Sequence, residues 1–366
     1  MQHDTGISSR ADHSIDLKGI SKTFGRLTAL HPVDLSVRKG EFLTLLGPSG
    51  SGKTTLLNLI AGAIAPTTGA ILLDGRDITR MPPRDRGIGM VFQNYALMPH
   101  MSVFENVAYP LRARRQPTKM IRAKVQDALE RVGLRGFEDR KPRQLSGGQQ
   151  QRVGIARCIV YSPAIIMMDE PLGALDKNLR DHMQGEIKRL HETLGTTIIY
   201  VTHDQEEALN MSDRVCLMNG GQIAQLGTPD DLYFQPRNRF VAEFVGESNL
   251  ISGRVSGNGR MTIGGNQSVA IPGGRRPEGS ELLVMVRPEN VRIGGVGEVA
   301  VEGRDALNGE ITTVSFIGGM TRVTVSTENG LNFVARMVSG RAGTRPEPGA
   351  RVRLFWSSSD LVVLDD

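Results

Sequence analysis

A glycine-rich segment with one lysine is the part of the sequence whose residue types most directly indicate chemistry. It matches the pattern G-x-x-x-x-G-K-[ST] at every fixed position and reads Gly47, Pro48, Ser49, Gly50, Ser51, Gly52, Lys53, Thr54. The backbone N–H groups of such a loop converge at the start of a helix and bind phosphate. We expect Lys53 to contact the β- and γ-phosphates of a nucleotide, Thr54 to bind Mg²⁺, and Thr55 to reach the α-phosphate. An ordinary Gly/Ser turn is the alternative.

Two adjacent carboxylates follow an apolar run at residues 165–168. Asp169 stands where a phosphate-loop ATPase holds Mg²⁺, usually through water. Glu170 points elsewhere and can orient or deprotonate an attacking water. Acids are common at the edges of sheets, so this pair is weak support alone. Together with the glycine-rich loop it favours hydrolysis of a nucleotide.

The elements that must position these residues alternate between strand and helix. Residues 41–46 predict a strand and residues 54–64 a helix, with the phosphate loop between them. Residues 165–168 and 197–201 are continuous apolar runs, typical of strands buried on both faces of a parallel sheet. Residues 118–132 place Ile121, Val125, Leu129 and Val132 on one helical face. The first part of the chain is therefore predicted to be an α/β domain.

The composition changes near residue 244. Residues 244–366 hold 20 of the 43 glycines and no lysine. Short alternating runs at 322–325, 331–334 and 352–355 predict a small all-β barrel or sandwich. We expect a loose tail at residues 1–15, an α/β domain at 16–243 with a helical subdomain at about 95–160, and an all-β domain at 244–366.

Charge and cysteine content exclude several classes of protein. Two cysteines, Cys158 and Cys216, are too few for a disulfide scaffold or a multi-cysteine zinc module. No apolar run is longer than five residues, the length of the run at 164–168, and the polar first 13 residues lack the apolar core of a signal peptide. These features favour a cytosolic protein. The net charge of +5 is interspersed, and the part after residue 245 is neutral, so we expect no nucleic-acid partner.

The segment Leu-Ser-Gly-Gly-Gln-Gln-Gln-Arg at residues 145–152 resembles the signature of the ATPase subunits of ABC transporters. Further elements of that family follow in order. Phe24 stands where an aromatic ring, more often tyrosine, stacks on adenine; Gln93 matches the Q-loop, Asp176 the D-loop and His203 the switch histidine. Each has a simpler alternative: Phe24 as a core residue, Gln93 as a surface residue, His203 or better Asp204 as a helix cap, and Ser146 as an N-cap.

The resemblance implies a P-loop NTPase fold, ATP and Mg²⁺ as cofactors, and defined roles for the matching residues. Catalytic roles fall to Glu170, His203, Gln93 and Lys53, and Mg²⁺ binding to Thr54, Gln93 and Asp169. In this family the signature residues of one subunit close over the ATP held by the other; here they are Ser146, Gly147, Gly148 and Gln149. One phosphate loop and one signature per chain therefore imply a head-to-tail homodimer.

The resemblance also implies membrane partners. Residues 93–101, with Tyr95, Leu97, Met98 and Pro99 expected to be exposed, match the segment that receives the transmembrane permease subunits. Residues 283–291 and 309–318 look like the OB-type TOBE domain of importers that use an external substrate-binding protein. Residues 82–97 and 99–107 are most similar to the spermidine/putrescine branch. We therefore expect a peripheral protein on the cytoplasmic face of the inner membrane.

Several alternatives remain open at this point. The same ATPase role in a sugar, phosphonate or ferric iron importer is one. Another is a non-transport ABC protein of translation or DNA repair, although two cassettes or a long insertion would be expected there, and Lys53 and Asp169 are only 116 residues apart. A P-loop kinase or GTPase would need no signature segment.

Overall fold

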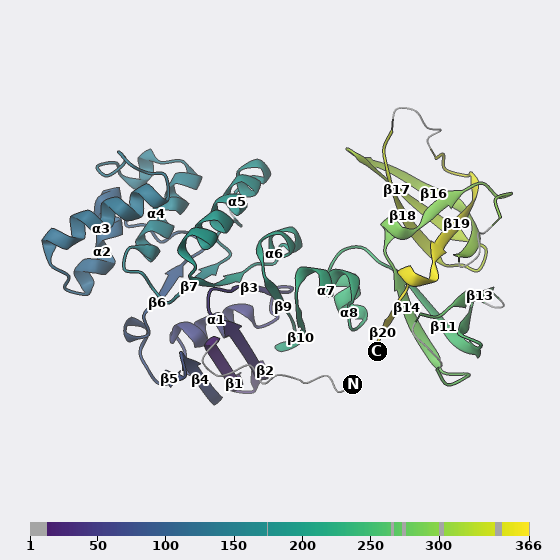
Figure 1. Ribbon diagram of the computed structural model, residues 1–366, viewed down its shortest axis with the longest axis horizontal. Helices are drawn as coiled ribbons and strands as arrows, with labels where there is room; N and C mark the ends of the chain where they lie inside the picture. Colours follow the sequence, from purple (N-terminus) through teal and green to yellow (C-terminus); the bar gives the residue numbers. More distant parts are fainter. Residues whose placement is uncertain are drawn as a thin grey trace, which may run out of the picture. The chain divides into compact units, whose positions relative to one another are not determined.

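The computed structural model describes residues 13–173, 175–264, 267–272, 276–299, 304–340 and 346–365. The chain forms two compact units, one up to Pro229 and one from Asp230 onward (Figure 1). Each unit has a hydrophobic core of its own and is described by itself.

A six-stranded sheet is the centre of the first unit. Its order is β10-β9-β3-β8-β7-β6, and all neighbours are parallel except the edge strand β10. Every residue of β3 and β8 is buried, as the apolar runs predict for strands covered on both faces. The strands are β3 (Phe42–Leu46), β6 (Ile88–Val91), β7 (Ile165–Asp169), β8 (Thr197–Val201), β9 (Arg214–Asn219) and β10 (Gln222–Gly227).

A second, antiparallel sheet in the same unit has the order β2-β1-β4-β5. The sequence patterns above do not predict it. Its strand β1 begins at His13, so the last three residues of the expected loose tail are part of the sheet, while residues 1–12 lie outside the described residues. The strands are β1 (His13–Phe24), β2 (Leu27–Arg38), β4 (Thr68–Leu73) and β5 (Arg76–Asp77).

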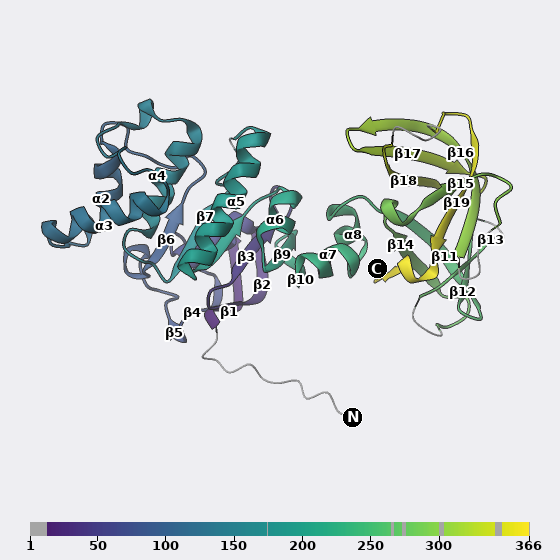
Figure 2. The same cartoon turned by 45° about the horizontal axis from the view of Figure 1, so that its top comes forward.

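The helices of the first unit fall into two groups. Helices α1 (Lys53–Ala61), α5 (Lys177–Leu194) and α6 (Gln205–Met211) lie against the six-stranded sheet. Helices α2 (Val103–Ala113), α3 (Thr118–Arg131) and α4 (Gly147–Ile159) gather beyond the β6 edge (Figures 1 and 2). The predicted face of α3 is buried, including Ile121, Val125 and Leu129. Two 3₁₀ turns, Pro83–Asp85 and Pro142–Gln144, complete this unit.

The second unit holds two five-stranded antiparallel sheets, of order β13-β12-β11-β14-β20 and β15-β19-β16-β17-β18. The expected runs at 322–325, 331–334 and 352–355 lie in β17, β18 and β19. In the core the buried Trp356 stacks on Phe333, with ring centroids 5.3 Å apart. The strands are β11 (Asn249–Gly257), β12 (Arg260–Ile263), β13 (Gln267–Ala270), β14 (Glu281–Val286), β15 (Arg292–Gly294), β16 (Arg304–Ile317), β17 (Met320–Thr327), β18 (Asn332–Val338), β19 (Arg351–Ser357) and β20 (Val362–Leu364); short 3₁₀ turns cover Pro288–Asn290 and Ser358–Asp360.

A buried arginine fixes two short helices to this second unit, α7 (Pro229–Phe234) and α8 (Arg239–Phe244). The side chain of Arg287 is 2% exposed, and its guanidinium lies 4.1 Å from the ring centroid of Tyr233. It donates hydrogen bonds to the main-chain oxygens of Tyr233, Ala242 and Glu247 and to Oγ of Ser248. These contacts explain why the compact units divide before α8, earlier than the border that we predict at residue 244.

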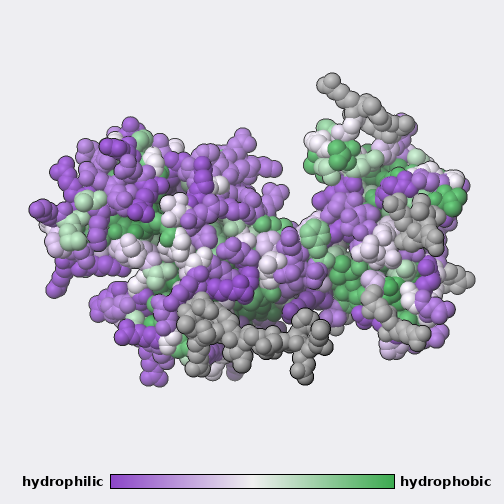
Figure 3. Space-filling view, viewed as in Figure 1, coloured by the Kyte–Doolittle hydropathy of each residue, from purple (hydrophilic) through white to green (hydrophobic). Residues whose placement is uncertain are grey.

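The visible surface of the first unit is largely hydrophilic, whereas the second unit shows a hydrophobic patch over the ends of β16 and β17 (Figure 3). Exposed apolar residues there include Ile317, Met320 and Val338. Among the described residues, the helices are all too short or too polar to cross a membrane.

Candidate functional site

The residues expected to act together lie at one edge of the six-stranded sheet. Adjacent parallel strands end at the same edge, so the segments that follow β3, β6, β7 and β8 meet there. The register is fixed by hydrogen bonds: N–H of Glu170 donates to O of Val201 (3.0 Å), and N–H of Thr202 donates to O of Leu45 (3.2 Å). The fold thereby brings together the phosphate loop, Gln93, Asp169, Glu170 and His203.

The backbone of the phosphate loop requires glycine, as Gly52 and Gly47 show. Gly52 caps α1 with a φ of 100°, in the left-handed region. Gly47 has a φ of 152°, and a Cβ there would lie 2.3 Å from the main-chain oxygen of Met218 on β9. The loop can therefore pack against β9 and present the free N–H groups of the first turn of α1. This arrangement fits a phosphate group.

Lys53 closes the loop from inside. Its side chain is buried, and Nζ donates to the main-chain oxygens of Gly47 (2.7 Å) and Pro48 (2.9 Å). Burial lowers the pKa of Lys53, and the negative charges of Glu170 and Asp169 oppose that shift. A partly desolvated ammonium beside a loop of N–H groups favours an anionic ligand, because the ligand supplies the missing counter-charge.

The oxygen donors near the loop suit Mg²⁺. Thr54 is exposed in the first turn of α1, and Asp169 ends β7. Burial, and then the charge of Glu170, raise the pKa of Asp169, while Lys53 opposes them. No group of three or more His, Cys, Asp or Glu residues in the described part of the chain could hold a metal. The oxygen atoms of Thr54 and Asp169 are of the kind that can bind Mg²⁺ together with phosphate oxygens.

Glu170, His203 and Gln93 converge at one place. Oε1 of Glu170 lies 3.3 Å from Nδ1 of His203. A Cβ built on Gly173 would lie 3.8 Å from Nε2 of Gln93 and 4.0 Å from Oε2 of Glu170. Glu170 also has a φ of 43°, a left-handed conformation that costs energy for a residue with a side chain. This backbone strain is typical of a residue whose side chain must point in a required direction.

The signature residues form the N-terminus of α4. Oγ of Ser146 accepts from N–H of Gln149 (3.4 Å), and Oε1 of Gln149 accepts from N–H of Ser146 (3.0 Å). This is a capping box, so Ser146 is the N-cap that one of our alternatives described. Ser146 and Gly147 are exposed, whereas Gly148 packs on Leu179 of α5. A helix N-terminus is thus presented at the surface.

The signature residues and Asp176 are not joined to the phosphate loop of the same chain. Among the described residues, no hydrogen bond or ion pair links them. Asp176 is exposed and caps α5, with Oδ1 accepting from N–H of Leu179 at 3.0 Å. Ala174, two residues before Asp176, lies outside the described residues.

Two aromatic residues, Phe24 and Tyr95, differ in their exposure. Phe24 is 49% exposed at the end of β1, with Nζ of Lys22 lying 4.9 Å from its ring centroid. The alternative of a core aromatic is therefore wrong, and the ring is available for stacking. Tyr95, expected to be exposed, is buried at 8%, because its main chain lies against Gly154 of α4. Leu97 and Met98 are half-buried, and Pro99 is exposed.

The sequence interpretation missed one residue of this region. Arg180, on α5, lies 3.1 Å from Oδ2 of Asp204 through Nη1. Asp204 is the N-cap of α6, as the alternative to a His203 cap proposed. Nothing local marks Arg180, since its partner is 24 residues away on another helix.

Comparison with known proteins gives matches over both parts of the chain. A family model described as ABC transporter matches residues 30–173, and one described as TOBE domain matches residues 284–364. The spermidine/putrescine import ATP-binding protein PotA of Thermobifida fusca is 44% identical over 98% of this chain and 95% of its own length. The protein of the same name from Acidothermus cellulolyticus is 46% identical over 93% of this chain and 91% of its own length.

Solved structures are similar over about 60% of the chain. The protein cbiO1 of Clostridium perfringens, part of the ABC transporter complex cbiONQ, has a TM-score of 0.58 and 29% identity, covering 61% of this chain and 92% of its own. The ATP-binding cassette MJ0796, in a dimeric structure bound to ADP and Pi, has a TM-score of 0.52 and 35% identity, covering 59% of this chain and 98% of its own.

The PotA relatives match both units, and this chain has the expected fold, an α/β P-loop NTPase followed by an all-β TOBE domain of OB type. The domain of this chain that the ABC transporter model matches binds ATP and hydrolyses it. The chain therefore belongs to the ABC transporter family, as an ATP-hydrolysing protein of the group that includes the spermidine/putrescine import ATP-binding proteins.

Proposed function

We propose that this protein is the ATP-hydrolysing subunit of a binding-protein-dependent importer of polyamines of the spermidine/putrescine type. The observation that carries the proposal is that a relative named for this import matches 98% of the chain, across both units. Relatives that matched only the ATPase domain would not indicate which substrate is transported. We also propose that residues 16–243 form the ATPase domain and residues 244–366 the TOBE domain.

In this proposal the phosphate loop, residues 47–54, binds the β- and γ-phosphates together with Lys53, and Thr55 binds the α-phosphate. The exposed ring of Phe24 stacks on the adenine. Thr54, Asp169 and Gln93 hold Mg²⁺, which supplies charge neutralisation for the phosphate oxygens when bound. The oxygen chemistry of these side chains and the partial burial of Asp169 support this assignment.

Hydrolysis is assigned to the three residues that converge beyond β7 and β8. Glu170 accepts a proton from the attacking water, since a carboxylate aimed at this position can act as a general base. His203, within 3.3 Å of that carboxylate, orients it and contacts the γ-phosphate. Gln93, whose amide faces the same point, orients the water.

The active site is completed by a second copy of the chain. The signature residues Ser146, Gly147, Gly148 and Gln149 present a helix N-terminus, and among the described residues no hydrogen bond or ion pair joins them to the phosphate loop of the same chain. A head-to-tail dimer places this positive end, together with Asp176, over the ATP of the partner. The dimeric structures of the similar cassette MJ0796 support this arrangement.

We further propose that transmembrane permease subunits dock at residues 93–101, where Pro99 is exposed, and that an external substrate-binding protein delivers the polyamine. The protein then lies peripherally on the cytoplasmic face of the inner membrane. Uptake of radiolabelled spermidine and putrescine tests this in cells whose own copy of the gene is deleted. The wild-type chain should restore uptake, and Glu170→Gln should not.

Uptake of maltose, a phosphonate and ferric iron is measured in the same cells. Restoration of one of these instead of polyamine uptake would reject the substrate class but keep the ATPase role. ATPase activity that responds to ribosomes or DNA and not to membranes carrying the permease would reject transport.

A further inference from the structure

Arg180 lies between two loops of the proposed active site. It belongs to the first turn of α5, directly after Asp176, and its side chain is 29% exposed. Nη2 donates to the main-chain oxygen of Leu175 (3.1 Å), and Nη1 donates to Oδ2 of Asp204 (3.1 Å). One guanidinium thus joins the loop before α5 to the residue that follows His203.

The residues on both sides of His203 form one hydrogen-bonded group. Oδ1 of Asp204 caps α6 by accepting from N–H of Glu206 (2.8 Å), and N–H of Asp204 donates to Oγ1 of Thr202 (3.0 Å). Oε2 of the buried Glu207 accepts from Oγ1 of Thr202 at 2.8 Å. Because both neighbours of His203 are held in this way, a shift of Asp204 would displace the imidazole.

The charge and partial burial of Arg180 suit it to hold the hydrogen-bonded residues around His203 in place. Nε of Arg180 lies 3.8 Å from Oε1 of Glu207 and, within the described part of the chain, has no hydrogen-bond partner of its own. The guanidinium therefore lies beside two carboxylates, those of Asp204 and Glu207, and also binds the main-chain carbonyl of Leu175. A lysine has a single ammonium and cannot span the carbonyl and the carboxylate together in this geometry.

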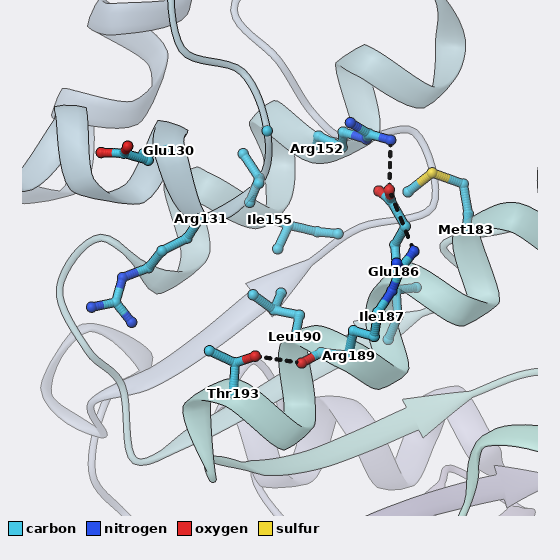
Figure 4. Close-up of a pocket in the computed structure, with 12 residues that line it drawn as sticks. Glu130, Arg131, Arg152, Ile155, Met183, Glu186, Ile187, Arg189, Leu190 and Thr193 are labelled. Atoms are coloured by element: carbon cyan, nitrogen blue, oxygen red, sulfur yellow. Dashed lines mark hydrogen bonds and ion pairs between the residues drawn. The ribbon is translucent and has the colours of Figure 1, made fainter.

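Helix α5 is also fixed to the signature helix. Oε1 of Glu186 on α5 accepts from Nη2 of Arg152 on α4 at 2.8 Å, and both side chains are about three-quarters buried (Figure 4). Leu179, one residue before Arg180, packs on Gly148 of the signature. Helix α5 thus contacts the signature helix with one part and the His203 loop with another.

We propose that Arg180 is a positioning residue for ATP hydrolysis, which transmits the position of the Leu175–Asp176 segment to His203. This rests on the proposed function, in which His203 contacts the γ-phosphate and Asp176 faces the partner copy. In the closed dimer the partner would fix Asp176, and the arginine would then fix His203 against Glu170. A cleft of about 410 Å³, lined by Arg180, Asp204 and His203 among others, leaves room for the imidazole to move when the link is broken.

The experiment is a double-mutant cycle of Arg180→Gln and Asp204→Asn. Asparagine caps helices as well as aspartate, so Asp204→Asn removes the charged partner of Arg180 and keeps the cap of α6. Each variant should lower kcat of ATP hydrolysis about tenfold, with the Kd for ATP unchanged and an unchanged melting temperature for Asp204→Asn. The double variant should equal either single one, because both break the same link. Arg180→Lys should recover only part of kcat.

Arg189→Gln is the matched control, since it removes an equal charge from the exposed side of the same helix and should keep wild-type kcat. The inference would be overturned if the reductions of kcat in the two single variants multiplied in the double variant, or if Asp204→Asn kept the wild-type kcat. Loss of melting temperature without loss of kcat per folded molecule would assign Arg180 a purely structural role. His203→Ala is measured alongside: wild-type hydrolysis there rejects the proposed function itself, whereas an inactive His203→Ala beside an active Arg180→Gln rejects only this inference.

Discussion

Replacing Glu170 by glutamine tests the proposed chemistry most directly. The carboxylate lies 3.3 Å from His203 through Oε1, is 26% exposed, and is carried on a backbone with a φ of 43°. Glutamine keeps the shape and an oxygen that can face His203, but it cannot take a proton from water. A general base contributes about 10²- to 10⁴-fold in rate. Loss of the base therefore raises the barrier by about 3–5 kcal/mol.

The assay measures phosphate release over a range of ATP concentrations, and ATP binding by calorimetry. We expect kcat to fall at least about a hundredfold while Kd stays within a few-fold of wild type, and ATP to trap a dimer that size-exclusion chromatography detects. Glu192→Gln, an exposed carboxylate on α5, is the matched control and should change neither value. A kcat of Glu170→Gln equal to that of wild type would show that another group accepts the proton.

Three further outcomes are expected. Lys53→Met removes an ammonium that binds two main-chain oxygens, and calorimetry should show ATP affinity reduced at least about a hundredfold. The pKa of Asp169 is raised in the folded state, so folding stability falls as pH rises through that pKa. Asp169→Asn should therefore raise the melting temperature of the nucleotide-free protein at pH 7 more than at pH 4. The same variant should lose Mg²⁺-dependent hydrolysis. A lower melting temperature at pH 7 would contradict this. Arg287→Met leaves several carbonyls of the second unit without their hydrogen-bond donor, which should destabilise that unit by about 3 kcal/mol or more. Urea titration followed by circular dichroism measures this. An unchanged urea midpoint would refute the prediction.

The parts of the site that could be predicted are those with local signals. The phosphate loop and the segments around Asp169 and His203 carry their chemistry within a few residues of an apolar strand, and the parallel sheet then brings them together. In the antiparallel sheet, the pairing of β1 with β4 joins residues far apart in the chain, such as Leu17 and Ile71, whereas the β1–β2 hairpin, with Phe24 opposite Leu27, is local and our patterns do not use it. Tyr95 lies with its Cα and Cβ against Gly154 of α4, and Arg180 pairs with Asp204, which is 24 residues away. Contacts of this kind depend on tertiary packing, which no local pattern encodes.

The stacked pair of Trp356 and Phe333 has a practical consequence. Trp356 is the sole tryptophan of the chain, and it is buried in the core of the second unit beside Phe333. Its fluorescence, excited selectively at long wavelength, therefore reports on the core of the TOBE domain. A change in that emission on addition of ATP would be an optical measure of how far the ATPase domain communicates with its neighbour, obtained without any label.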